Sequence, residues 1–223
     1  MSENIKIFLQ DPHQIDFEKY KAYVLKKNEI SLINFKEADL KFLFKKIYYL
    51  GFLQEKLEIN SDFLKEAIFN LLLSMDLLNF HFWNPLKLQL RSSIEQFYRY
   101  LLKRIEIDTT EMSARNINST VKSNYQNLKL SSLIAKLQAD YKDLCNYVHV
   151  SIKEFFSKNH SLNYLSTIED KKLRNIINQI SRICDCFVII LISLNYDSYC
   201  KIGLYNQNFI ENSLSKEKLE NYL

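Results

Sequence analysis

Glycine and proline are nearly absent from this 223-residue chain, which contains only two of each. Average usage is about 7% for glycine and about 5% for proline, so sharp turns and strained loops must be few. A glycine-rich phosphate-binding loop is excluded because Gly51 and Gly203 lie far apart in the sequence. This shortage favours long helices that are joined by short polar connections.

Metal-binding and membrane-spanning patterns are also missing from the sequence. The histidine, cysteine and carboxylate residues show neither paired CxxC motifs nor an HExxH motif, and we interpret the four cysteines as free thiols in the core. The first residues, MSENIKIFLQDPHQ, lack the basic start and apolar run of a signal peptide. The longest apolar run, FVIILISL, is much shorter than the roughly 18 residues that span a bilayer. We therefore expect a cytoplasmic protein with no metal, no cofactor and no membrane partner.

Apolar and aromatic residues, by contrast, are plentiful. Hydrophobic residues make up 47% of the chain, and 15 phenylalanines with 14 tyrosines can build a large core, so a disordered chain is excluded. The length suits one domain, or one domain with a small appendage. The net charge of +4 is a weak positive bias, compatible with an anionic partner and equally with an ordinary solvated surface.

The hydrophobic spacing predicts a bundle of four long helices. Apolar residues recur every three or four residues in each helix, and the helix lengths suit antiparallel packing about a shared core. The polar connection 108–129 is rich in Ser, Thr and Asn and is expected to hold one short helix. The predicted bundle helices lie near residues 61–80, 85–106, 131–157 and 168–195, with Ser61 and Asn84 as N-caps.

We divide the chain into three parts. Residues 1–60 are predicted to form an N-terminal helical extension in two pieces, with Gly51 at an end or a kink of the second piece. Residues 61–200 form the helical bundle, and residues 201–223 form a C-terminal helix, beginning at about residue 208, or a tail. No alternating segment indicates a strand, so the predicted fold class is all-α.

The second bundle helix carries a charged stripe. Arg91, Glu95 and Arg99 are spaced four residues apart, which places them on one face of the helix and permits contacts of alternating sign. One interpretation is a solvated row of salt bridges. The other is a binding site in which guanidinium groups hold a phosphate.

The third bundle helix carries a polar stripe at the edge of its apolar face. Lys142, Asn146 and His149 share this stripe, so His149 is expected at the border between core and surface. A histidine in that place is either a core-edge residue with satisfied nitrogens or an acid-base group. Two other histidines, His13 and His160, lie in polar connections and are expected to be exposed.

These two helices together resemble the HEPN superfamily of all-helical RNA-targeting and nucleotide-binding domains. The resemblance rests on YKDLCNYVHVS (residues 141–151) in one helix, on the preceding helix that contains RSSIEQFYRYLL (residues 91–102), and on the polar connection between them. It covers about residues 61–195 and implies an antiparallel HEPN-like bundle.

The HEPN ribonuclease motif, an arginine that precedes a histidine at a spacing of four to six residues, is degenerate in this sequence. Lys142, followed by Asp143, comes nearest to the motif before His149. Lysine provides charge without the planar fork that arginine offers to a phosphate. We therefore hypothesise that Arg91 or Arg99 supplies the guanidinium from the neighbouring helix.

The resemblance implies a metal-independent endoribonuclease or toxin that acts in antiviral defence or in a toxin-antitoxin system. RNA carries its own nucleophile in the 2′-hydroxyl group, so cleavage needs an acid or base near neutral pH and a cation at the phosphate. The implied partners are RNA, a second copy of the chain in a homodimer, and an antitoxin or defence-system protein. The expected catalytic residues are His149, Arg91, Arg99 and Lys142. The expected substrate-binding residues are Glu95, Asn146 and Tyr147, and the ring of Tyr147 would stack on a base.

The alternative is a non-catalytic helical interaction or dimerisation module. In that case Arg91, Glu95, Asn146 and His149 form a hydrogen-bonded network that fixes the register of the helices or of a dimer interface. A nuclease predicts a solvent-accessible His149 beside an arginine in a basic cleft. A structural network predicts a buried His149 with both nitrogens satisfied within one subunit.

Overall fold

The computed structural model of the chain describes residues 12–27, 37–79, 82–126, 129–148 and 170–214. Within these ranges every regular element is a helix and no strand occurs, so the predicted all-α class is confirmed. The helices, in chain order, are α2 (Pro12–Lys27), α3 (Glu37–Lys56), α4 (Asp62–Asn79), α5 (Trp83–Arg104), α6 (Ala114–Tyr125), α7 (Ser131–Val148), α8 (Asp170–Leu194), α9 (Tyr196–Lys201) and α10 (Leu204–Ser213).

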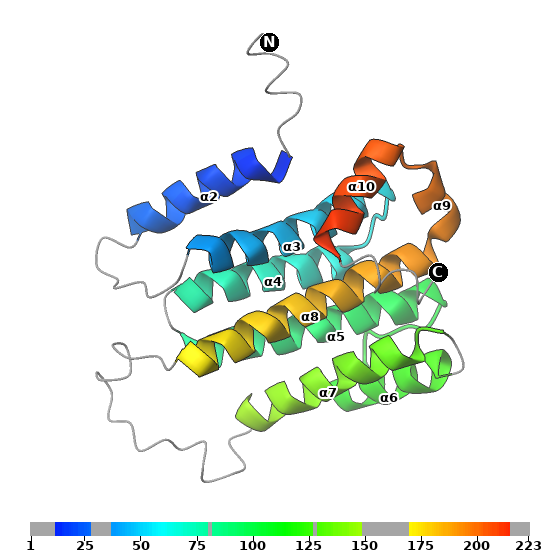
Figure 1. Cartoon of the computed structure of the whole chain (residues 1–223). Helices are drawn as coiled ribbons and strands as arrows, with labels where there is room; N and C mark the ends of the chain where they lie inside the picture. Colours follow the sequence, from blue (N-terminus) through cyan, green and yellow to red (C-terminus); the bar gives the residue numbers. More distant parts are fainter. Residues whose placement is uncertain (1–11, 28–36, 80–81, 127–128, 149–169, 215–223) are drawn as a thin grey trace.

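The four predicted bundle helices correspond to α4, α5, α7 and α8 (Figure 1). Helix α7 is described as far as Val148, so the predicted continuation to residue 157 lies outside the described residues. Ser61 acts as an N-cap, as predicted, because its Oγ accepts a hydrogen bond from the amide of Leu64 at 3.4 Å. The polar connection holds the one expected short helix, α6, which Ser113 caps in the same way.

Three predicted helix boundaries are wrong. Gly51 does not end its helix, because α3 continues to Lys56 and the buried residues Leu50 and Leu53 hold it in the core; the alternative of a kink at Gly51 stays a prediction. Asn84 lies in the first turn of α5 and not at its cap, because the carbonyl of Phe82 already accepts a helical hydrogen bond. The C-terminal helix α10 begins at Leu204 and ends at Ser213, and residues 215–223 lie outside the described residues.

Helix α8 lies at the centre of the bundle. It packs against α3, α5 and α7, while α4 packs along α5, and α6 packs against α5 and α7 (Figure 1). Between α5 and α8 the rings of Phe97 and Phe187 stack with their centroids 3.8 Å apart, and both side chains are fully buried. The segment Lys171–Leu194 is long and apolar enough to cross a membrane, but 78% of its most apolar window is buried inside the protein. Its composition is therefore that of a core helix.

The N-terminal helices share this core. Helix α2 packs on α3, and α3 packs against α4 and α8. Lys46 of α3 and Asp185 of α8 form a buried ion pair, with side chains only 9% and 7% exposed. Tyr20 of α2 donates a hydrogen bond to Asp76 of α4 at 2.6 Å. The described residues on both sides of residue 60 therefore contribute to one hydrophobic core. The division of the chain at residue 60 stays a prediction.

His13 is buried, whereas the sequence predicted an exposed residue. It lies in the first turn of α2 and is 4% exposed. Its ring centroid is 5.7 Å from that of Tyr49 and 6.4 Å from that of Tyr48. The prediction failed because α2 begins at Pro12, so His13 belongs to a helix that packs on α3. His160 lies outside the described residues.

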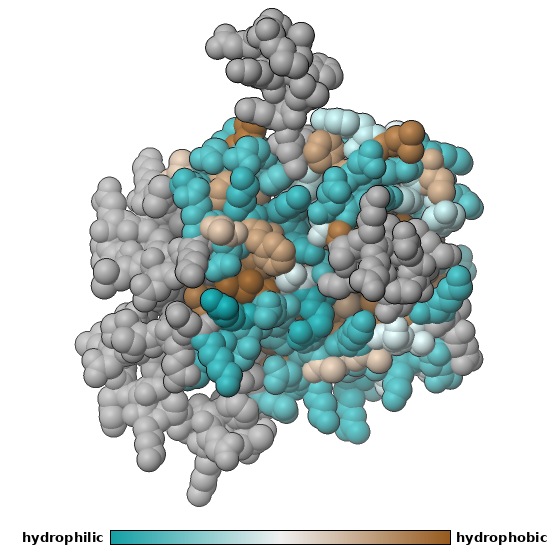
Figure 2. Space-filling view, in the orientation of Figure 1, coloured by the Kyte–Doolittle hydropathy of each residue, from teal (hydrophilic) through white to brown (hydrophobic). Residues whose placement is uncertain are grey.

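The outer surface is predominantly hydrophilic on the face that Figure 2 shows, with hydrophobic side chains in small groups between polar ones. This distribution is usual for a folded helical domain, whose surface always retains some apolar atoms. Any specific site must therefore be recognised from the arrangement of individual polar side chains.

Candidate functional site

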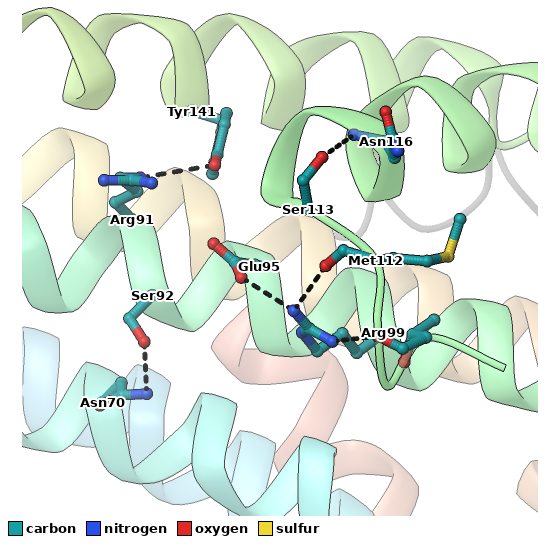
Figure 3. Close-up of polar contacts among 10 residues, drawn as sticks. Asn70, Arg91, Ser92, Glu95, Arg99, Met112, Ser113, Asn116 and Tyr141 are labelled. Carbon is teal, nitrogen blue, oxygen red and sulfur yellow. Dashed lines mark hydrogen bonds and ion pairs between the residues drawn. The ribbon is translucent and has the colours of Figure 1, made fainter.

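The predicted stripe on α5 faces α6 and α7. Arg91 lies against Tyr141 of α7, with its Nε donating a hydrogen bond to the tyrosine oxygen at 3.4 Å (Figure 3). The guanidinium carbon is 5.7 Å from the centroid of the Tyr141 ring, within the range of a cation-π contact. Arg91 of α5 therefore contacts α7 at Tyr141.

Arg99 has a different environment from Arg91. Its Nη1 donates to the carbonyl of Thr109 at 2.5 Å, and its Nη2 lies 3.3 Å from both the carbonyl of Met112 and a carboxylate oxygen of Glu95. The side chains of Arg99 and Glu95 are 16% and 20% exposed. The pair thus holds the connection between α5 and α6 against α5 (Figure 3). This arrangement is a hydrogen-bonded support for the connection, and both terminal nitrogens of Arg99 take part in it.

The predicted site residues of the third bundle helix lie in different environments. Lys142 is exposed and Asn146 is half-buried. The backbone of Tyr147 belongs to α7, but the structure does not describe its side chain, and His149 lies outside the described residues. The structure therefore brings Arg91 to α7 at Tyr141, and it does not test the position of the predicted acid-base residue.

Helices α5 and α7 run antiparallel where these residues meet. Arg91 and Tyr98 of α5 both lie beside Tyr141, and the rings of Tyr98 and Tyr141 have centroids 6.5 Å apart. Cys145, one turn after Tyr141, lies close enough to affect the pKa of Arg91. The last turn of α7 is consequently near the beginning of α5, at the end of the bundle where α8 also begins (Figure 1).

Charge and burial at this contact keep Arg91 cationic and Tyr141 protonated. Burial opposes the charge on Arg91, but the hydrogen bond that Arg91 donates to Tyr141 and the nearby Glu95 outweigh this effect and raise the pKa of the guanidinium. Burial also raises the pKa of Tyr141, and the charge of Arg91 only partly offsets this effect. The contact is therefore a cation beside a neutral phenol.

A buried hydroxyl adds to the polar character of this interface. Tyr98 is 1% exposed, and its hydroxyl oxygen makes no hydrogen bond within the described part of the chain. Burial, together with Cys186, Tyr141 and Asp140, raises its pKa well above the usual value. A cluster of polar groups thus lies between α5, α7 and α8.

Sequence reasoning missed an ionic contact between α7 and α8. Arg182 donates to both carboxylate oxygens of Asp140, from Nε at 2.9 Å and from Nη2 at 2.5 Å, and Gln179 donates to the same carboxylate at 3.1 Å. Asp140 is only 5% exposed, whereas Arg182 is 47% exposed. The sequence signal that could have predicted this contact is Asp140, a charged residue next to Tyr141 of the apolar face of the third bundle helix. The contact fixes the two helices relative to each other.

Lys87 is a second residue that the sequence analysis missed. It lies one turn before Arg91 on α5 and is half-buried. Burial lowers its pKa, Asp143 of α7 opposes this shift and Lys172 of α8 adds to it, so the pKa of Lys87 is about 8. No spacing rule identifies this residue, because its environment depends on two other helices.

The described residues offer no metal centre. No group of three or more His, Cys, Asp or Glu side chains that could hold a metal ion occurs among them. The four cysteines are free, as predicted, and Cys184 and Cys186 are buried in the core. Cys145 is half-buried and Cys200 is exposed, so the predicted core position is wrong for Cys200, which lies in the short outer helix α9. Burial raises the pKa of the Cys186 thiol to about 12, so it behaves as a packing residue.

A cleft lies elsewhere, where the C-terminal parts of α5 and α8 meet the connection between α3 and α4. Its volume is about 320 Å³. Arg104 in its wall already donates to the side-chain oxygen of Asn195 at 2.9 Å and to the carbonyl of Leu194. None of the predicted site residues lines this cleft.

No protein-family model, no curated protein and no solved structure matches this chain. The helices of the described residues define the structural class of the protein as an all-α helical bundle. The resemblance to the HEPN superfamily rests on the sequence segments alone.

Proposed function

We propose that this chain is a HEPN-like RNA-targeting protein that acts as a metal-independent endoribonuclease or toxin in antiviral defence or in a toxin-antitoxin system. The observation that supports this proposal is the contact of Arg91 with Tyr141 on α7. It places a guanidinium group beside the helix whose sequence continues to His149. An arginine from a neighbouring helix thereby takes the place of the arginine that is missing from the degenerate motif.

Arg91 is the better candidate of the two arginines for the phosphate contact. Its Nε is held by Tyr141, and within the described residues its two terminal nitrogens make no hydrogen bond. The terminal nitrogens of Arg99, in contrast, are directed to the connection between α5 and α6. A guanidinium group held at one nitrogen and available at the other two suits a bidentate contact with phosphate oxygens.

The proposed reaction uses the substrate's own nucleophile. The 2′-oxygen attacks the adjacent phosphorus as His149 takes its proton, and the bond from phosphorus to the 5′-oxygen breaks. An acid returns a proton to the departing 5′-oxygen, so the products are a cyclic phosphate and a 5′-hydroxyl. Arg91 would stabilise the negative charge that develops on the phosphate. Lys142, Asn146, Tyr147 and Glu95 remain proposed contacts to the RNA, and Arg99 supports the site.

The cellular setting belongs to the same proposal. A reducing cytoplasm agrees with four free cysteines, two of which are buried. A homodimer and an antitoxin or defence-system partner follow from the HEPN resemblance.

A structural module is the second candidate, and two networks favour it. Arg99 and Glu95 fix the connection after α5, and Asp140, Gln179 and Arg182 fix α7 against α8. Such contacts set the register of helices without any chemistry. In this case Arg91 would be one more member of the packing between helices.

Cleavage of labelled cellular RNA and tRNA in the presence of a chelator tests the two candidates. We expect His149→Ala to lose about 100-fold or more of the activity, as the removal of an acid-base group does. His160→Ala is the matched control, since it removes a second histidine eleven residues further along the sequence, and it should cleave like the wild type. Equal cleavage by both variants, with equal helical content, would favour the structural module.

A further inference from the structure

The cleft beside the C-terminal end of α5 is separate from the site of Arg91. Its wall combines the last turn of α5 with the connection between α3 and α4 and with Asn195 after α8. From Arg91 to Arg104 the axis of α5 rises about 20 Å, so the two places are well separated along this helix (Figure 1). The volume of about 320 Å³ lies at the lower end of the range for small-molecule sites.

Tyr100 lines this cleft and carries a hydroxyl group without a hydrogen-bond partner. Its side chain is 5% exposed, and its hydroxyl oxygen makes no hydrogen bond within the described part of the chain. The hydroxyl of the nearby Tyr125 donates instead to the carbonyl of Leu101 at 3.0 Å. Buried hydroxyl groups nearly always have a partner, so an unpaired one in the wall of a cleft points to a bound molecule that supplies it.

Two basic residues of α5 bring positive charge to the same cleft. Arg104 is held in place, because its Nη1 donates to Oδ1 of Asn195 at 2.9 Å and its Nη2 donates to the carbonyl of Leu194. Lys103 is exposed, and its ammonium lies 5.6 Å from the centroid of the Phe63 ring. Within the described residues Lys103 has no ion pair, so its charge is available to an anion.

The N-terminus of α4 also borders the cleft. Ser61 lies in the wall, and its Oγ caps α4 by accepting a hydrogen bond from the amide of Leu64. The positive end of the helix dipole and the first amides of a helix favour a negatively charged group nearby. With Lys103 and Arg104 beside it, this side of the cleft suits the double negative charge of a phosphate monoester.

The other polar residues of the wall suit hydroxyl groups. Glu58 is exposed and disfavours a bare phosphate ion, but its carboxylate can accept hydrogen bonds from the hydroxyl groups of a ligand. Asn60 accepts a hydrogen bond from Lys65 at its Oδ1, at 3.0 Å, which leaves its amide nitrogen as a donor. The cleft therefore has a positive side for an anion and a neighbouring side for hydroxyl groups.

We propose that this cleft binds a small phosphate ester that carries hydroxyl groups, such as a sugar phosphate. Lys103, Arg104 and the N-terminus of α4 hold the phosphate. Tyr100 donates its unpaired hydroxyl to an oxygen of the ligand, and Glu58 and Asn60 bind the hydroxyl groups of the sugar. The inference does not rest on the proposed RNA-targeting function, because the cleft contains none of the residues of that site.

Calorimetric titration of the full chain with ribose 5-phosphate, inorganic phosphate and ribose tests the inference. Ribose 5-phosphate should bind, inorganic phosphate should bind more weakly, and ribose should show no binding. Lys103→Met removes the available ammonium and should weaken the binding of ribose 5-phosphate about tenfold, because a charged hydrogen bond is lost. Lys122→Met, on the exposed side of α6, removes the same charge and should bind like the wild type.

Tyr100→Phe separates binding from folding. Because this variant loses only an unpaired hydroxyl, the ligand-free protein should be at least as stable to urea as the wild type, whereas ribose 5-phosphate should bind about fivefold more weakly. Tyr98→Phe is the matched control. Tyr98 is a second buried tyrosine of α5 whose hydroxyl has no partner within the described residues, but it does not line the cleft, so the affinity should not change.

Three results would overturn the inference. The first is that ribose 5-phosphate does not bind at millimolar concentrations. The second is that Lys103→Met and Tyr100→Phe both bind it with the affinity of the wild type, which would mean that the ligand lies elsewhere. The third is that a single-stranded RNA oligonucleotide needs Lys103 for binding while ribose 5-phosphate does not bind, which would assign the cleft to RNA. Loss of RNA cleavage or binding at Arg91 would leave the inference unaffected.

Discussion

Arg91 and Arg99 occupy one face of α5, two turns apart, yet the structure gives them different surroundings. Arg99 has backbone carbonyls and a carboxylate around its terminal nitrogens, whereas Arg91 is held only at Nε by Tyr141 within the described residues (Figure 3). Equal spacing therefore does not give equal roles. The helix decides which residues share a face, and the elements that pack on that face decide what each residue can bind.

The largest expected difference between the two arginines is in catalysis. Arg91→Ala should lower the rate of metal-independent RNA cleavage by about 100-fold, because it removes the group that stabilises charge on the phosphate. The free energy of unfolding of this variant should change by less than about 1 kcal/mol, because the hydrogen bond that is lost is long, at 3.4 Å. Cleavage assays with urea denaturation of the same sample measure both quantities. Cleavage at the wild-type rate by Arg91→Ala would mean that Arg91 has no catalytic role that distinguishes it from Arg99.

The second largest effect is expected in stability. Arg99→Ala should lower the free energy of unfolding by about 2 kcal/mol, because the carbonyls of Thr109 and Met112 lose a charged donor in a half-buried place. The cleavage rate per folded molecule should stay within about threefold of the wild type. Arg99→Lys serves as the control and should recover part of the stability, since one donor is kept. Unchanged stability in Arg99→Ala would mean that the connection does not need this support.

The smallest expected effect concerns the pH dependence of stability. Lys87 has a pKa of about 8 in the folded protein against 10.5 for an ordinary lysine, so the unfolded chain binds more protons between these values. The free energy of unfolding should therefore rise with pH from about 8 to about 10.5. The contribution is about 1 kcal/mol after allowance for solvent screening of a partly exposed group. Urea denaturation across this range should show the rise in the wild type and not in Lys87→Met.

The helices of the bundle were predictable because local signals agree with the packing. Long stretches with three- and four-residue spacing and almost no glycine or proline leave few alternatives to a helical bundle. Ser61 and the short helix after the polar connection were also accessible, since capping is a local interaction. Gly51 misled the prediction, because buried neighbours on both sides keep the helix intact despite the conformational freedom of glycine.

The candidate site was only partly predictable, because its chemistry depends on contacts between distant segments. The sequence placed Arg91 and Arg99 on one face, but only the fold distinguishes the one that holds a connection from the one that meets α7. The environment of Lys87 is set by α7 and α8, and Asp140 finds its partner Arg182 some 42 residues later. The position of His149 remains a prediction, since it lies outside the described residues.

The buried ion pair of Lys46 and Asp185 has a consequence for how the chain is made. Its two members are 139 residues apart, so during synthesis α3 is complete long before α8 leaves the ribosome. Until then the ammonium of Lys46 has no counter-charge from α8, and burying it alone would cost several kcal/mol. The N-terminal helices must therefore wait for the last long helix before their final packing can form. A nascent chain arrested after α7 should consequently remain sensitive to proteolysis along α3.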